Sequence, residues 1–132
     1  MMQPEPQTHL ERLLARAHAN PTDAKAYTAF VKELIATTVG VLGHAEPHGF
    51  QPLALTPSGS LGVCVFTHPV RYDAFTATQL PALDWQVRPD RARPLFEWAV
   101  ANDLFVLLNP GSPLSKDFPP FELNDVLHGR WI

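Results

Sequence analysis

The sequence predicts an α/β (α+β) fold, in which a mixed β-sheet is packed with helices in a single compact domain. Three observations support this prediction. Two amphipathic helical patterns come first and indicate an N-terminal helical hairpin. Two short runs, residues 61–67 and 105–108, are almost entirely apolar, which is typical of strands covered on both faces. Helical patterns alternate with these strands in the second half, as they do in layered domains.

Both N-terminal helices have start signals and an apolar stripe. Thr8 and Glu11 match a capping box, and an Asn-Pro pair at 20–21 ends the first helix. The apolar positions of this helix are Leu10, Leu13, Leu14 and Ala17. Thr22 or Asp23 caps the second helix. Its stripe consists of Tyr27, Phe30, Val31, Leu34 and Ile35. We expect both stripes to face one sheet.

The middle of the chain is predicted to contain strands and turns. Residues 37–42 are rich in β-branched side chains and favour a strand, whereas the Gly-, Pro- and His-containing stretch 43–50 is predicted to be a loop. Residues 51–56 favour a short strand. A hairpin turn is expected at 57–60, because Gly59 can adopt the positive φ that such turns need.

Helices are predicted to frame the second buried strand. Pro69 suits the first turn of a short helix, and residues 84–88 have a weak strand pattern. A further helix is expected over 94–102, just before the apolar run. The last helix is expected to begin at the Pro pair 119–120 and to end before Gly129.

Length and composition limit the class of protein. We expect residues 1–7 to form a disordered tail and residues 8–132 to form one domain, which is long enough to bury a core without metals or disulfides. A hydrophobic content of 45% with 17% charged residues is typical of a globular chain. The net charge of -3 argues against nucleic-acid binding. Arg88, Arg91 and Arg93 are close in sequence and are predicted to be a solvated helix entry.

The sequence also favours a reducing compartment. Cys64 is the single cysteine, so no disulfide can form within the chain. No signal-peptide pattern is present, and no apolar run reaches the roughly 18 residues that a membrane span needs. We therefore expect a cytoplasmic protein that does not bind membranes.

Three segments carry a resemblance to a known family. They are VCVFTHP (63–69), PLFEWAVANDLFVLLNPGSP (94–113) and FPPFELNDVL (118–127). In order and spacing they resemble the N-terminal domain of the SseB (enhanced serine sensitivity) family, over about residues 8–129. The resemblance implies no particular reaction, cofactor or catalytic residue. His68 departs from the small capping residue that is usual there, and a function residing in a second domain, which many relatives carry, is expected to be absent.

The turn after the second buried strand is the main candidate site. Asn109, Gly111 and Ser112 follow that strand, and open α/β sheets bind ligands at the carboxyl ends of their strands. Asn109 and Ser112 could donate to an anion or a peptide; the alternative is a purely structural turn. Lys116 lacks the spacing of a P-loop, and no nucleophile-elbow motif is present.

The other candidates are aromatic or metal-ligating. Trp98 and Trp131 are predicted either to cover a core edge or to belong to a partner surface. His44 and His48 are in a loop rather than on a helix, so they are not predicted to hold a metal. Cys64, in an apolar strand, is predicted to pack as a small apolar side chain.

The sequence therefore predicts a non-catalytic protein-interaction or regulatory module with a protein partner, including the possibility of a homodimer. No cofactor, metal, nucleic acid or membrane is expected. One alternative is a small-ligand-binding protein or enzyme that uses the cleft near Asn109 and Ser112; another is an immunity or adaptor protein that binds one partner. Replacing Asn109 and Ser112 by Ala is expected to weaken partner binding without unfolding the domain.

Overall fold

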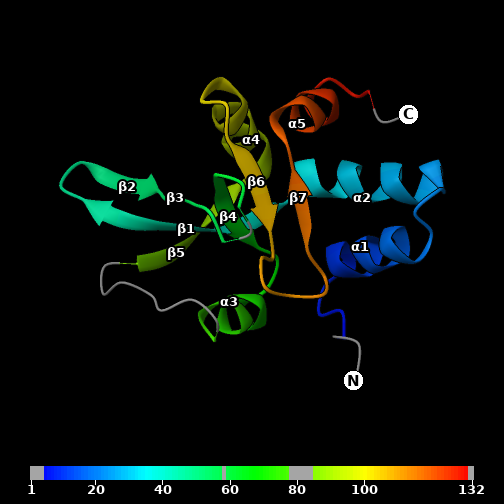
Figure 1. Cartoon of the computed structure of the whole chain (residues 1–132), viewed down its shortest axis with the longest axis horizontal. Coiled ribbons are helices and arrows are strands. Elements are labelled where there is room, and N and C mark those ends of the chain that lie inside the picture. Colours follow the sequence, from blue (N-terminus) through cyan, green and yellow to red (C-terminus); the bar gives the residue numbers. More distant parts are fainter. Residues whose placement is uncertain (1–4, 58, 78–84, 131–132) are drawn as a thin grey trace.

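A computed structural model describes residues 5–57, 59–77 and 85–130 of the chain. In these residues five helices pack on one seven-stranded mixed sheet (Figure 1). The helices are α1 (His9–Ala19), α2 (Ala24–Ala36), α3 (Pro69–Thr76), α4 (Ala92–Ala101) and α5 (Pro120–Leu127). The strands are β1 (Thr38–Glu46), β2 (Gly49–Pro52), β3 (Ala54–Leu55), β4 (Gly62–Phe66), β5 (Trp85–Arg91), β6 (Phe105–Leu108) and β7 (Lys116–Phe118). The predicted fold class is confirmed.

The sheet is mixed because one pair of strands is parallel. β4 and β6 run parallel, joined through α3, β5 and α4, and every other pair is antiparallel. The main strand order is β2-β1-β4-β6-β7, with β3 beside β4 and β5 beside β1. β5 pairs with β1 over most of its length, from Thr38 opposite Arg91 to His44 opposite Trp85. Among the described strands, β5 therefore lies at one edge of the sheet.

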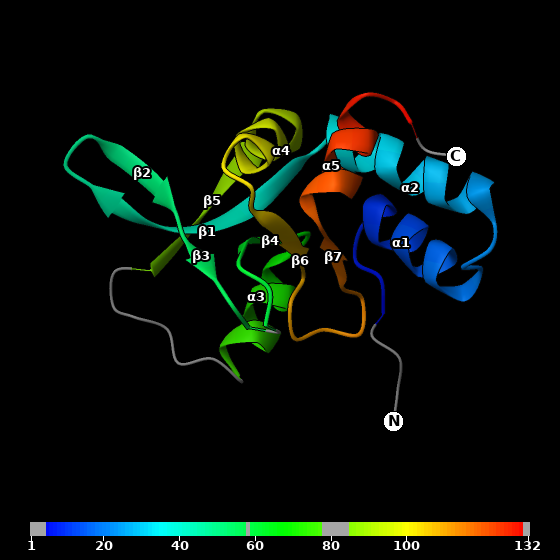
Figure 2. The same cartoon turned by 45° about the horizontal axis from the view of Figure 1, so that its top comes forward.

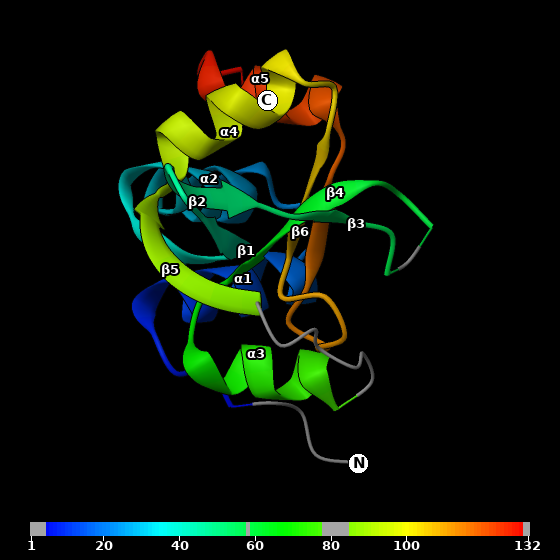
Figure 3. The same cartoon turned by 90° about the vertical axis from the view of Figure 1, so that its left-hand side faces the viewer.

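The two faces of the sheet are covered unequally. One face packs against α1, α2, α4 and α5 and forms the larger core, which includes Val39, Val41, Val65, Val106 and Leu108. The opposite face carries a smaller core with only α3 on it, made of Leu42, Cys64, Phe66, Phe75 and Leu107. Figure 3 shows α3 below the strands of the sheet and α4 with α5 above them. The N-terminal helical hairpin is confirmed, and both of its apolar stripes face the larger core.

Side chains cap three of the helices at their starts. Thr8 Oγ1 accepts from the Glu11 N–H at 3.0 Å, and Asp23 Oδ1 accepts from the Lys25 N–H at 3.0 Å. At the start of α3, His68 Nδ1 accepts from the Val70 N–H at 3.1 Å. The His68 imidazole therefore caps the start of α3, as the smaller side chains of Ser, Thr, Asp or Asn do at other helix starts.

The prediction of a loop over residues 43–50 was wrong. β1 continues to Glu46 and β2 begins at Gly49, so most of that stretch forms a hairpin (Figure 2). Gly49 has a φ of +136°, which suits the tight turn. Pairing between the strands, from Gly43 opposite Pro52 to Glu46 opposite Gly49, outweighs the weak local propensity.

Other boundaries differ in smaller ways. The strand expected over 51–56 is interrupted at Leu53, between β2 and β3, and its hairpin with β4 is confirmed. β7 has three residues and was not predicted, because so short a strand has no measurable periodicity. β5 is longer than the expected strand and contains Arg88, which is exposed. Arg91 ends β5 and is also the N-cap residue of α4, so it lies at an exposed helix entry, as predicted. None of the described helices has the length and apolarity that crossing a membrane requires.

Candidate functional site

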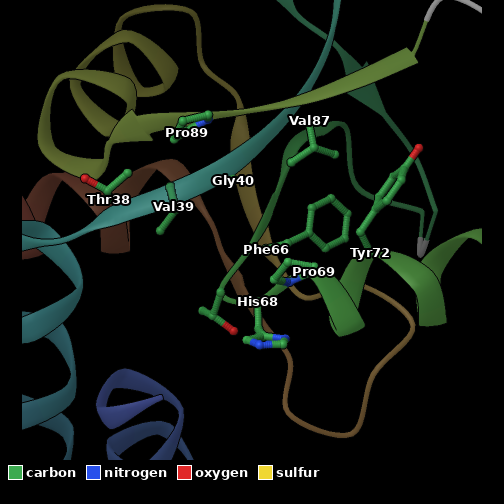
Figure 4. A pocket seen from close by; sticks show the side chains of 10 residues that line it. Thr38, Val39, Gly40, Phe66, His68, Pro69, Tyr72, Val87 and Pro89 are labelled. Carbon is green, nitrogen blue, oxygen red and sulfur yellow. The ribbon is translucent and has the colours of Figure 1, made fainter. Parts of the chain in front are cut away.

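A groove lies on the face of the sheet that α3 covers only in part. Strand register places Gly40 opposite both Pro89 and Phe66 on this face. α3 covers the neighbouring part, where the Phe75 ring packs on the rings of Phe66 and Trp85 at centroid distances of 5.6 and 6.3 Å. Beyond that contact, a cleft of about 420 Å³ remains open beside Gly40 (Figure 4). We call this cleft, with the polar cleft that adjoins it, the α3 groove.

The lining of the first cleft is mainly apolar. Its residues are Thr38, Val39, Gly40, Phe66, Thr67, His68, Pro69, Tyr72, Val87 and Pro89. Figure 4 shows Val87, Phe66 and Tyr72 gathered at one end and Thr38 with Pro89 at the other. A Cβ atom at Gly40 would lie 2.8 Å from Val87 Cγ1. The absence of a side chain at this position therefore keeps the floor of the cleft open.

The second cleft is polar and has a volume of about 380 Å³. It is lined by Ile35, Ala36, Thr37, Thr38, Arg91, Arg93 and Pro94. Thr38 lines both clefts, so the two adjoin at the start of β1. The α3 groove thus passes from an apolar end to an end that carries two arginines.

A buried polar network supports the wall of the groove. Glu11 on α1 is fully buried and binds Arg71 on α3, with Nε and Nη2 at 2.9 and 2.6 Å from its two carboxylate oxygens. The Thr67 hydroxyl also donates to Glu11, and the Gln7 N–H does so at 2.7 Å. Arg71 Nη2 donates to the carbonyl of Glu5 at 2.9 Å. Residues 5 and 7, where we expected a disordered tail, therefore bond to the domain through their backbones.

These contacts change the acidity of Glu11. Burial alone would raise its pKa, but hydrogen bonds from Arg71, Thr67 and Gln7 outweigh burial and lower the pKa from 4.5 to about 2. Because the folded-state pKa is depressed, the resulting stability is fully present above the unfolded pKa and is lost as the pH falls toward the folded one. Above the unfolded pKa, the lowered pKa of Glu11 contributes about 3 kcal/mol to the free energy of unfolding.

We therefore predict an acid-sensitive stability that depends on Glu11. Between about pH 6 and about pH 3, the native chain should lose about 2 kcal/mol more unfolding free energy than the Glu11→Gln variant. Urea unfolding at both pH values measures this difference, and the variant itself serves as the control for all other carboxylates. Equal losses in the two proteins would show that Glu11 titrates normally in the folded state.

The side chains of the predicted site residues Asn109 and Ser112 lie behind this network rather than on an open surface, whereas Gly111 of the same turn is exposed. Asn109 is fully buried, and its Nδ2 donates to Thr67 Oγ1 and to the Leu114 carbonyl, both at 2.9 Å. Its Oδ1 accepts from the Thr67 N–H at 3.0 Å. Ser112 is 8% exposed, and its Oγ accepts from the Leu114 N–H at 3.1 Å. Gly111 has a φ of +84° and is exposed. Asn109 thus contributes to the groove by positioning Thr67.

Trp98, one of the two tryptophans of the predicted site, is not brought to the groove. Trp98 is half-buried on α4 and packs against the larger core, on the other face of the sheet. It therefore lies at a core edge, one of its two predicted positions. Trp131 lies outside the described residues.

A third cleft, of about 360 Å³, lies beside α1 and α2 and is bordered by Tyr27 and Lys116. The Tyr27 hydroxyl donates to Glu122 at 2.5 Å, and Lys116 Nζ donates to the same carboxylate at 3.1 Å. Burial, and then the Glu122 carboxylate, raises the pKa of Tyr27 well above its ordinary value. Tyr27 therefore remains a protonated phenol whose hydroxyl donates its hydrogen bond to Glu122, so it is unsuitable as a general base.

The other candidate groups have structural roles or lie on the surface. Cys64 is fully buried, and burial, followed by the Asp117 charge, raises its pKa to about 12, so the thiol packs as an apolar side chain as predicted. His44 Nε2 lies 3.0 Å from Glu46 Oε1 on the hairpin, and His48 is exposed at its turn. Within the described ranges, no three His, Cys, Asp or Glu side chains are placed to hold a metal ion.

Sequence reasoning missed the residues that form the groove. Val87, Pro89 and Gly40 come from two strands that pair across the sheet, and no local motif connects them. Glu11 was expected only as a helix-capping residue, and its partner Arg71 is 60 positions away. The one available signal was Gly40 within a β-branched run, since glycine in a strand often marks a close approach.

Comparison with known proteins agrees with the resemblance found in the sequence. The model of the SseB protein N-terminal domain matches residues 10–125. Searches of curated proteins and of solved structures found no match. The matched span contains the α3 groove and the Glu11, Thr67 and Arg71 side chains of the network behind it, and it covers most of the 132 residues. The chain therefore belongs to the family of SseB protein N-terminal domains.

Proposed function

We propose that this chain is a non-catalytic cytoplasmic protein-interaction or regulatory module and that the α3 groove is its binding surface. One contrast carries the proposal. The first cleft of the groove is mainly apolar and open over about 420 Å³, whereas no buried side-chain nitrogen or oxygen of the described residues lacks a hydrogen-bond partner. Catalysis and the recognition of polar metabolites need converging polar groups that are free to act.

Exposed apolar side chains beside the groove support a protein partner. Val87 on β5 is 36% exposed and Val70 on α3 is 41% exposed. Val87 lines the cleft, and Val70 follows directly after Pro69, which also lines it. Apolar side chains that cluster around a cleft are typical of surfaces that bind other proteins.

A small apolar ligand is the second candidate. The volume of the first cleft lies within the roughly 300–1,000 Å³ that is usual for small-molecule pockets. The polar groups at its rim, such as His68 and Thr67, already make internal hydrogen bonds, which favours the protein partner. An adaptor or immunity role would be the special case in which one partner binds tightly.

Affinity capture with matched variants tests the proposal. The tagged chain, its Val87→Asp variant and its Phe121→Asp variant are incubated with an extract of the source cells, and bound proteins are identified by mass spectrometry. Phe121 is 73% exposed on α5, so its replacement is a control for the loss of an exposed apolar side chain away from the groove. We expect one stoichiometric partner that Val87→Asp reduces about tenfold and Phe121→Asp leaves unchanged.

The other outcomes lead to different conclusions. Loss of the partner with Phe121→Asp alone would move the binding surface to α5. Absence of any stoichiometric partner would favour the small-ligand candidate. Circular dichroism establishes that each variant is folded, and Val87→Thr, which keeps the β-branched shape, is a milder replacement if Val87→Asp destabilises β5.

A further inference from the structure

The chemistry of the α3 groove changes along its length. Val87, Pro89 and Arg91 alternate along β5 and so share one face of the strand. Val87 and Pro89 line the apolar cleft, whereas Arg91 lines the polar one. The four residue steps from Val87 to Arg91 span about 13 Å at the usual rise of a strand. A bound molecule that follows β5 over this distance meets an apolar surface and then positive charge.

The positive charge at the polar end is not neutralised by the rest of the described chain. The Arg91 guanidinium makes no hydrogen bond or ion pair with any described side chain. The Arg93 guanidinium donates to the Leu127 carbonyl at 3.3 Å, and no described carboxylate forms an ion pair with it. Both side chains are exposed, in a protein whose net charge is -3. Two unneutralised guanidinium groups beside one cleft favour a carboxylate-bearing ligand.

We propose that the α3 groove binds an extended segment of a partner protein in which apolar side chains are followed by acidic ones. This inference rests on the proposed function and names the chemistry of the partner. The apolar side chains lie against Val87, Phe66 and Tyr72. The carboxylates that follow reach Arg91 and Arg93, where guanidinium groups can bind them with two parallel hydrogen bonds. About six residues in an extended conformation cover both ends.

A second copy of this chain fits the groove less well. Pairing of two β5 edges would require N–H donors along the strand, and Pro89 in its middle has none. Arg88 and Asp90 add charges to the same exposed strand, which is typical of edges that avoid pairing with other strands. Recognition through side chains in the groove is not affected by the missing N–H group.

Three pools of labelled peptides test the inference by fluorescence anisotropy on the full chain. Each peptide has about eight residues. The first pool carries mixed Leu, Ile, Val and Phe in one half and Asp or Glu in the other. The second has Lys in place of the acidic residues, and the third has Ser in place of the apolar ones. Two charge-reversed variants are compared: Arg91→Glu with Arg93→Glu at the groove, and Arg16→Glu with Lys25→Glu on α1 and α2 as a control of equal net charge.

The first pool should bind about tenfold more tightly than either of the others, and added salt should weaken it. The groove variant should reverse the preference, so that the Lys pool binds better than the acidic pool, whereas the control variant should keep the original order. Val87→Asp should weaken binding of the first pool. Equal binding of the acidic and Lys pools, or an unchanged order in the groove variant, would overturn the inference while leaving the groove as a protein-binding surface.

Two further outcomes would also overturn it. If no pool binds but affinity capture still finds a Val87-dependent partner, the proposed function stands and the groove binds a folded surface instead of an extended segment. Light scattering at two protein concentrations tests for self-association. A dimer that Val87→Asp dissociates would show that a second copy occupies the groove.

Discussion

Replacing Glu11 by Gln is expected to lower the free energy of unfolding by about 3 to 5 kcal/mol. The carboxylate is fully buried, and it compensates the charge of Arg71, which is 6% exposed. A neutral amide leaves that guanidinium in the interior without a counter-ion, and it also turns an acceptor of the Thr67 hydroxyl into a group that can donate. Urea unfolding of the native and variant chains measures the loss.

Two control variants distinguish the loss of the charge that compensates Arg71 from a nonspecific effect of replacing Glu by Gln. Glu97→Gln, at an exposed position of α4, should change the stability by less than about 0.5 kcal/mol. The double variant Glu11→Gln with Arg71→Met should be more stable than the sum of the two single losses predicts, because it leaves no uncompensated charge. A loss of less than about 1 kcal/mol for Glu11→Gln alone would mean that water reaches the pair.

The ion pair also connects stability to the proposed binding surface. Arg71 lies on α3, whose first turn provides Pro69 and Tyr72 to the groove wall. Glu11 lies on α1, on the opposite face of the sheet, and its bonds to Arg71 and Thr67 hold α3 in place. Variants of Glu11 should therefore weaken partner binding indirectly, even under conditions in which the domain stays folded.

The parts of the fold that could be predicted are those with strong local signals. β4 and β6 are runs of apolar residues with both faces covered, and they were found nearly to the residue. The turn before β4 was predicted from Gly59, whose φ is +97°. Each helix was predicted from its cap or from proline at its start, although α4 begins at Ala92 rather than at Pro94.

The parts that could not be predicted depend on contacts between distant residues. Residues 43–50 have loop-like composition, and they become a hairpin because β1 pairs with β2 and with β5 at once. β5 itself contains Pro89 and three charged residues, Arg88, Asp90 and Arg91, so its local propensity is weak. The groove is made by the register of these strands, and that register is a property of the whole sheet.

The polar side chains of the predicted site, Asn109 and Ser112, are buried and hydrogen-bonded within the domain. The turn at Asn109 does adjoin the groove, because Thr67 lines the groove and bonds to Asn109. The sequence alone does not show whether a polar side chain at a strand end points into solvent or forms hydrogen bonds within its own domain. At Asn109 each polar atom of the side chain amide is bonded within the domain.

Because Asn109 is buried, we expect Asn109→Ala to destabilise the domain rather than to remove a binding contact. The expected loss of unfolding free energy is about 3 to 5 kcal/mol. The substitution leaves the Thr67 N–H and the Leu114 carbonyl without their partners. Each such loss costs roughly 1 to 3 kcal/mol in the interior. The backbone adds strain, since φ at this position is +50°, a region that Asn tolerates better than Ala. Thermal and urea unfolding measure the change.

Two further variants, Asn109→Gly and Ser112→Ala, separate the contribution of backbone strain from that of lost hydrogen bonds. Glycine adopts a positive φ without strain, so Asn109→Gly should be less damaging than Asn109→Ala by the backbone contribution alone, about 1 kcal/mol. Ser112→Ala removes the single bond to the Leu114 N–H and should cost about 1 kcal/mol. If Asn109→Ala instead abolished partner capture while the unfolding transition stayed unchanged, Asn109 would touch the partner directly, and the buried network would not describe the bound state.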